Sequence, residues 1–238
     1  MGEAVTAVLA GGLRLQRAQV DLTAHNMANQ STVGFRAQRP VASEHVYARA
    51  PASVSVVRLA AAMVDETGGR QTVTGAPLDL AIDGEGYFQV AGPDGAPLLT
   101  RAGQFERTAA GAIVAPDGAA VLDEGGAPLA IPADAASVDI ARDGTITADG
   151  QPVGRVGVVT TEGALVRRVG ARFAAEGPVV PVDAPRVRQG VLENANVDPI
   201  GELTRLIEAS RRYEMLQGMV EKEDGRVGNL IETLSRVR

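Results

Sequence analysis

The chain has 238 residues and a net charge of −6, with no Cys, no Trp and only two His. The missing Cys exclude disulfides, thiolate metal sites and cysteine nucleophiles, and two His argue against multi-histidine metal centres and most Ser-His chemistry. The acidic balance argues against a general nucleic-acid-binding protein.

Residues 1–34 are expected to form a helix that needs a partner. Its apolar seam has a column of small residues (Ala4, Gly11 and Ala18) and a column of branched ones (Val8, Leu15 and Leu22). A stripe of this kind does not stay in water, so it needs a second helix, from the same chain or from a neighbouring copy. No basic segment precedes an apolar run, so no cleavable secretion signal of the Sec type is predicted.

The middle of the chain is predicted to be β-structure. Residues 35–69 are expected to form an extended linker or a hairpin, and residues 70–190 an all-β domain, either a small sandwich or an irregular barrel. Alternating segments predict strands at 78–82, 87–90, 112–114 and 156–160. Asp-Gly pairs favour hairpin turns because both positions tolerate positive φ. Such pairs begin at Asp83, Asp94, Asp117, Asp143 and Asp149.

Residues 191–238 are predicted to contain a long helix that begins at Asp198 and Pro199, a capping residue followed by a first-turn proline. From Leu206 onward, alternating steps of three and four residues place apolar side chains on one seam, with Glu223 as the one break. The seam consists of Leu206, Ala209, Tyr213, Leu216, Val220, Val227, Leu230, Leu234 and Val237. Such a narrow stripe, sustained over more than four heptads, is typical of a coiled coil. The alternative is an ordinary amphipathic helix on a globular domain. The predicted fold is therefore α+β, with a helical pair from the two termini and a central β-domain.

The sequence contains no catalytic constellation. It has no G-x-S-x-G, no phosphate-binding loop of the G-x-x-x-x-G-K-[ST] type and no H-E-x-x-H. Gly84-Glu85-Gly86 is interpreted as a tight turn before Tyr87 and not as part of a nucleotide loop. We therefore expect no enzyme, cofactor, metal, nucleic acid or small-molecule substrate, and the pattern points to assembly.

The segment 26–36 resembles the N-x-A-N-x-x-T-x-G-[FY]-[KR] signature of bacterial flagellar rod, hook and hook-associated proteins. The positions that carry this resemblance are Asn26, Ala28, Asn29, Thr32, Gly34, Phe35 and Arg36. In physical terms, Asn and Ser compete for backbone hydrogen bonds at a helix end, Gly34 supplies a conformation that other residues resist, and Phe35 can anchor the chain. Segments 75–90, 100–105, 190–197, 206–207 and 211–214 are similar to further blocks of this family, in the same order, whereas Val33 departs from the usual Pro or Thr.

The resemblance implies a structural protein of the basal-body rod that crosses the periplasm. It implies that the terminal helices pair and polymerise around a central channel, that the β-domain lies outside them, and that the rod transmits torque. The implied partners are other rod proteins, copies of the chain itself and the flagellar type III export apparatus. Chain length and the segment 35–38 favour a proximal rod member, with a distal rod member as the alternative. Outside the family, the less favoured alternatives are a secreted or cell-surface module whose β-domain holds a small ligand, and a hydrolase that uses carboxylates of the β-loops.

Overall fold

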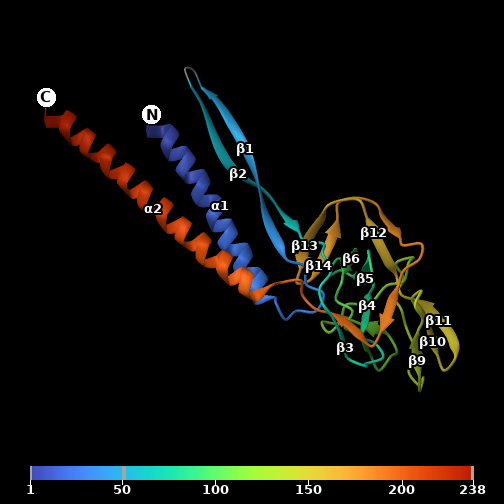
Figure 1. Ribbon diagram of the computed structural model, residues 1–238. Helices are drawn as coiled ribbons and strands as arrows, with labels where there is room; N and C mark the ends of the chain where they lie inside the picture. Colours follow the sequence, from blue (N-terminus) through green and yellow to red (C-terminus); the bar gives the residue numbers. More distant parts are fainter. Residues whose placement is uncertain (1, 50–51, 237–238) are drawn as a thin grey trace. The chain divides into compact units, whose positions relative to one another are not determined.

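The computed structural model describes residues 2–49 and 52–236, and the chain divides into two compact units (Figure 1). Unit 1 comprises Met1–Ala28, Gln38–Asp65 and Asp198–Arg238. Unit 2 comprises Asn29–Ala37 and Glu66–Val197. Each unit is therefore built from segments that are far apart in the sequence.

Unit 1 contains the two terminal helices, α1 (Gly2–Ala28) and α2 (Pro199–Arg236), which pack side by side (Figure 1). Helix α2 begins where the capping pattern predicts, because the Ile200 N–H donates to Asp198 Oδ1 at 3.2 Å and the Glu202 N–H donates to the Asp198 carbonyl at 2.9 Å. The predicted α+β fold with paired terminal helices is confirmed.

Unit 1 also contains a long antiparallel ribbon of strands β1 (Gln38–Arg49) and β2 (Ala52–Val64). The pairing runs from Gln38 opposite Val64 to Arg49 opposite Ala52, with an irregularity between Val41 and Ala42. Strand β2 packs against α1, and there Val56 is buried. Because a two-stranded ribbon is marginally stable alone, this packing supports it.

Unit 2 is a set of small antiparallel sheets. The largest has the order β13-β14-β6-β5-β12-β15, and a three-stranded sheet has the order β11-β10-β9. The pairs β3–β17 and β4–β16 join the beginning of the unit to its end, and β7 pairs with β8. The strands are β3 (Gln71–Val73), β4 (Leu80–Ile82), β5 (Tyr87–Ala91), β6 (Pro97–Thr100), β7 (Glu106–Arg107), β8 (Ile113–Val114), β9 (Val138–Ile140), β10 (Thr145–Ala148), β11 (Gln151–Arg155), β12 (Val158–Thr161), β13 (Leu165–Val169), β14 (Arg172–Ala175), β15 (Val179–Pro181), β16 (Val187–Gln189) and β17 (Val191–Glu193).

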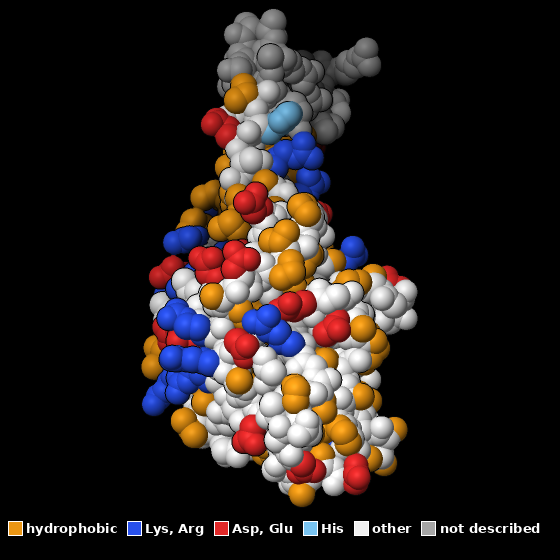
Figure 2. All heavy atoms as spheres, turned by 90° about the vertical axis from the view of Figure 1, so that its right-hand side faces the viewer, with side chains coloured by type: hydrophobic (Ala, Val, Ile, Leu, Met, Phe, Trp, Pro, Cys, Tyr) orange, Lys and Arg blue, Asp and Glu red, His pale blue; other side chains and the backbone are white. Residues whose placement is uncertain are grey.

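The core of unit 2 is mostly aliphatic, with few aromatic side chains. Phe88 and Phe105 meet edge to face with ring centroids 5.4 Å apart, and fully buried Val90, Ile131 and Ile146 lie in the same core. On the face of unit 2 that Figure 2 shows, apolar side chains are scattered among polar and charged ones. The buried apolar side chains of this unit form one core cluster.

Four Asp-Gly pairs lie at turns between adjoining, paired segments. Those beginning at Asp94, Asp143 and Asp149 connect β5 to β6, β9 to β10 and β10 to β11, and the one at Asp117 follows β8. The expectation of a hairpin at Asp83 is wrong. Strand β4 pairs with β16, while β5 pairs with β6 and β12, so this turn links two different sheets.

Candidate assembly site

The two helices of unit 1 approach each other closely at Gly12. A Cβ at this position would lie 3.2 Å from Leu216 Cδ1, tighter than most Cβ contacts. Ala209, on the same side of α2 as Leu216, is fully buried. Gly12 is not part of the predicted small column of Ala4, Gly11 and Ala18, so this close approach of α2 occurs one residue away from the column.

The structure places most of the predicted seam residues at half-buried positions of the two helices. The half-buried members are Leu15, Leu22, Leu206, Tyr213, Leu216 and Val220. Val8 and Val227 are exposed. Leu230 and Leu234 belong to α2, but their side chains lie outside what the structure describes, as does all of Val237. The predicted break, Glu223, pairs with Arg226 at 2.7 Å.

The buried amide of Asn26 ties together three elements of unit 1. Its Nδ2 donates to the Gln38 carbonyl at 2.9 Å and to Glu202 Oε2 at 3.5 Å, and its Oδ1 accepts from the Gln38 N–H at 2.9 Å. Glu202 is also buried and accepts from Arg205. The first Asn of the motif thus fastens the end of α1 to the start of β1 and to the first turn of α2.

The rest of the motif belongs to unit 2 and forms a tight loop. Thr32 donates its N–H to the Asn29 carbonyl at 3.0 Å, and its hydroxyl donates to Asn29 Oδ1 at 3.2 Å. Gly34 has φ +65°, and a Cβ there would lie 2.1 Å from the Ala102 nitrogen, so only glycine fits. Phe35 is fully buried, and the Arg167 guanidinium lies 4.4 Å from its ring centroid.

Next to this loop lies a buried charge cluster that the sequence analysis missed. Glu193 accepts from Arg36 at 2.5 Å, from Arg101 at 3.4 Å and from the Gly69 N–H at 2.8 Å. All three charged side chains are almost completely buried. All three residues lie inside the segments that carry the family resemblance, which is the one sequence feature that points to them. The local sequence pattern does not distinguish a buried charged side chain from an exposed one.

Burial sets the protonation equilibria around this cluster. It raises the pKa of Tyr87, whose ring faces the Arg101 guanidinium at 5.2 Å, and the carboxylate of Glu66 acts in the same direction. Burial lowers the pKa of Arg101 against the opposing effect of Glu193, and it lowers the pKa of Arg167 to about 10. Removal from water is the largest cause of the shift in all three groups.

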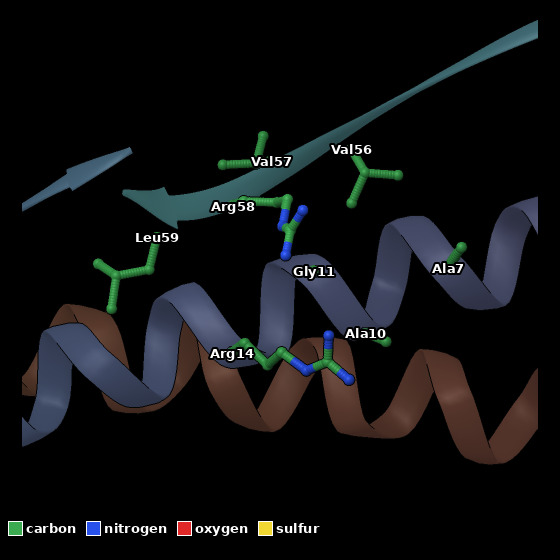
Figure 3. Close-up of a pocket in the computed structure, with 8 residues that line it drawn as sticks. All are labelled: Ala7, Ala10, Gly11, Arg14, Val56, Val57, Arg58 and Leu59. Carbon is green, nitrogen blue, oxygen red and sulfur yellow. The ribbon is translucent and has the colours of Figure 1, made fainter. Parts of the chain in front are cut away.

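A groove opens in unit 1 between α1 and β2 (Figure 3). Its cavity volume is about 500 Å³, and Ala7, Ala10 and Gly11 line it on the α1 side. Gly11 is the point of closest approach, because a Cβ there would lie 2.6 Å from Val56 Cγ1 and 2.7 Å from the Val57 carbonyl oxygen. A strand, and not the predicted partner helix, therefore packs on Gly11 of the small column.

Within residues 2–49 and 52–236, which the structure describes, no group of His, Asp and Glu side chains could hold a metal ion. Among the helices described, none is long and apolar enough to cross a membrane.

Two family models match the chain. One, described as the flagellar hook protein FlgE/F/G D1 domain, matches residues 81–148, and the other, the flagellar basal body rod FlgEFG protein C-terminal model, matches residues 188–233. The chain is 31% identical to the flagellar basal-body rod protein FlgF of Rhizobium meliloti (strain 1021), covering 92% of this chain and 93% of that protein. The chain belongs to the FlgE/F/G family of flagellar rod and hook proteins.

Other members of the FlgE/F/G family show the same extent of similarity. FlgF of Escherichia coli (strain K12) is 33% identical over 91% of this chain and 92% of its own length. FlgG of Agrobacterium fabrum (strain C58 / ATCC 33970) is 31% identical over 92% of this chain and 94% of its own length. The chain is thus a FlgF-like structural subunit of the flagellar basal-body rod, in a family of structural proteins and not of enzymes. Membership of this family implies assembly with other rod proteins.

Proposed function

We propose that this subunit builds the rod by polymerising through its terminal helices, as part of the shaft that transmits torque. The observation that supports this most directly is the apolar surface that α2 leaves uncovered while it packs on α1. Ile200, Leu203 and Ile207 are 79%, 47% and 46% exposed. Burial of such side chains favours assembly by about 25 cal/mol for each Å² removed from water.

In this proposal the predicted divisions of the chain have separate roles. Residues 1–34 and 191–238 supply the helical core, residues 35–69 support it, and residues 70–190 lie outside it and contact neighbouring subunits. The residues that carry assembly are those of the seam: Val8, Leu15, Leu22, Leu206, Tyr213, Leu216, Val220, Val227, Leu230 and Leu234. The partners are copies of the same chain, other rod proteins and the type III export apparatus.

The test is to delete the gene in its source bacterium and complement it with the wild type, with Leu216→Asp or with Gln217→Asp. Leu216 lies against α1, whereas its neighbour Gln217 is exposed, so the two variants place the same charge on different sides of α2. We expect loss of hooks and swimming in the deletion strain, rescue by the wild type and by Gln217→Asp, and no rescue by Leu216→Asp. Normal swimming of the deletion strain, or rods built from Leu216→Asp, would overturn the proposal.

We also propose that the subunit occupies the proximal part of the rod, the FlgF position, although FlgG relatives match it at similar identity. Electron microscopy of basal bodies from the deletion strain separates the two positions. A proximal subunit is required before the distal rod can be added, so we expect basal bodies without a distal rod or a hook. A rod that ends with its proximal part complete would assign the chain to the distal position.

A further inference from the structure

A cavity within unit 2 lies beside the buried charge cluster. Its volume is about 290 Å³, near the lower end of the range of small-molecule pockets. Arg36 and Arg101 line it, and both side chains are almost completely buried. Tyr87, Thr160 and Thr161 belong to the same lining, so hydrogen-bonding groups make up much of the wall.

Three N–H groups of these two arginines have no hydrogen-bond partner among the described residues. They are those of Arg36 Nε, Arg36 Nη2 and Arg101 Nε. The remaining nitrogens are engaged, since Arg36 Nη1 contacts Glu193 at 2.5 Å and donates to the Thr67 carbonyl at 2.7 Å. Arg101 Nη2 donates to the Gly84 carbonyl at 2.6 Å. A buried charged donor without an acceptor is costly, so the three unpaired groups call for an acceptor.

The unpaired nitrogens of Arg36 share one edge of its guanidinium group. The Nε–H and one Nη2–H of an arginine point in the same direction, and this edge can donate two parallel hydrogen bonds to the two oxygens of a carboxylate. Glu193 contacts Nη1 and not this edge. The acceptor that fits the edge is therefore an anion with two oxygens in one plane.

The charges around the cavity favour a singly charged anion. Arg36 and Arg101 share the one buried counter-charge of Glu193, so the cluster keeps an excess of one positive charge. Glu66 and Glu85 also line the cavity, but both residues are exposed, so water and salt screen their charges. The repulsion from these two carboxylates grows with the charge of the ligand, and it therefore acts more strongly on a doubly charged anion than on a singly charged one.

Tyr87 supplies a further hydrogen-bond donor to this cavity. Its pKa is raised, mainly by burial and in addition by the carboxylate of Glu66. The phenol therefore keeps its proton at neutral pH, and its hydroxyl can donate to an oxygen of an anion.

We propose that this cavity binds a small monocarboxylate, with Arg36 Nε and Nη2 holding its two oxygens and Arg101 Nε as a further donor. The carboxylate supplies the second counter-charge that the two buried arginines lack. Because both arginines are buried, entry of the ligand requires a local movement of the side chains that line the cavity. The site lies within unit 2, so it is separate from the helical seam through which the subunit is proposed to assemble.

The test is a titration of the full chain, labelled with ¹⁵N, with sodium acetate at an ionic strength held constant by sodium chloride. We expect a saturable shift of the NMR signals of the Arg36 and Arg101 Nε–H groups and of the Gly68 and Gly86 amides, which belong to residues that line the cavity. Inorganic phosphate, which is partly doubly charged at neutral pH, should bind at least tenfold more weakly. The absence of a saturable shift, or phosphate binding as tight as that of acetate, would overturn the site and leave the proposed function standing.

A matched pair of variants at Thr160 tests the charge of the site without changing the buried cluster. Thr160 is half-buried and lines the cavity, so Thr160→Glu adds a third carboxylate to the lining, whereas Thr160→Gln adds a neutral side chain of the same size. We expect acetate to bind at least tenfold more weakly to Thr160→Glu than to Thr160→Gln. Equal affinities in the two folded variants would overturn the site.

Glu66→Gln provides a test in the opposite direction at an exposed position, where the fold is not at risk. It removes a negative charge from the lining, so acetate should bind at least twofold more tightly than to the wild type. Unchanged or weaker binding of acetate to Glu66→Gln would overturn the site.

Discussion

Glu193 compensates more buried charge than any other described side chain of unit 2. It is the only carboxylate paired with Arg36 and Arg101 among the described residues, so the cluster keeps an excess of one positive charge out of water. Burial of ions costs several kcal/mol each, which is recovered only when the geometry is good and the remaining hydrogen bonds are made. The Gly69 N–H donates to the same carboxylate oxygen as Arg36, whereas Arg36 Nε and Nη2 and Arg101 Nε find no hydrogen-bond partner among the described residues.

The first prediction concerns this carboxylate. Glu193→Gln should lower the free energy of unfolding of unit 2 by about 3–5 kcal/mol, because it leaves two buried guanidinium groups without a counter-charge. Urea denaturation followed by circular dichroism measures the change. Glu162→Gln, at an exposed position of the same unit, should stay within about 0.5 kcal/mol of the wild type. A loss below about 1 kcal/mol in Glu193→Gln would show that the cluster does not depend on its charge.

The second prediction separates backbone strain from steric overlap at two glycines with positive φ. Gly118 has φ +86° with nothing within 4 Å of an added Cβ, so Gly118→Ala should cost only about 1–2 kcal/mol of left-handed strain. At Gly34 the added Cβ would also meet the Ala102 nitrogen at 2.1 Å. Thermal unfolding of Gly34→Ala should therefore show a clearly larger loss than Gly118→Ala. Equal losses would mean that the motif loop can move away from Ala102.

At the scale of elements, local signals predicted the helices well. The cap at Asp198 and the heptad spacing placed α2, because both depend on residues close in sequence. The pattern of residues 35–69 fits a linker as well as a hairpin, since most of the described side chains of β1 and β2 are exposed and their alternation is weak. The cluster of Arg36 and Glu193 joins positions far apart in the chain, and no local pattern contains that information.

The third prediction concerns the fastening between α1, β1 and α2. Asn26→Ala removes both hydrogen bonds to the backbone of Gln38 and the one to Glu202, and it leaves buried polar groups unpaired. We expect a loss of about 1–3 kcal/mol and faster amide hydrogen exchange in the last turn of α1 and the first turn of α2. Asn229→Ala, at an exposed position of α2, is the control. Unchanged exchange near Asn26 would mean that helix packing alone holds these turns.

At the scale of the whole molecule, apolar residues have two roles: they form a closed core in unit 2, and in unit 1 many of them remain exposed on the helices and the ribbon. Unit 2 closes its own core, and the segment after α1 is held to the segment before α2 within that unit. The Gly34 N–H donates to the Glu193 carbonyl at 2.7 Å, and the Ala37 N–H donates to Asn196 Oδ1 at 2.7 Å. Unit 1 leaves apolar side chains of its helices and ribbon exposed, such as Met63 and Ile200. The family resemblance implies assembly through the terminal helices, but the side chains that α1 and β2 cover on each other depend on contacts between residues far apart in the sequence.

The last prediction follows from that division. Because unit 1 buries less apolar surface per residue, its amides should exchange faster than those of unit 2 in the isolated subunit, and chemical denaturation should unfold it first. Hydrogen exchange with mass spectrometry should show low protection in α1, β2 and α2 and high protection in β5, β6 and β12. Glu193→Gln should then accelerate exchange in unit 2 and leave the ordering of unit 1 unchanged. A single cooperative loss of protection in all elements would show that the two units fold as one, and assembly would then add contacts to a rigid subunit instead of ordering a loose one.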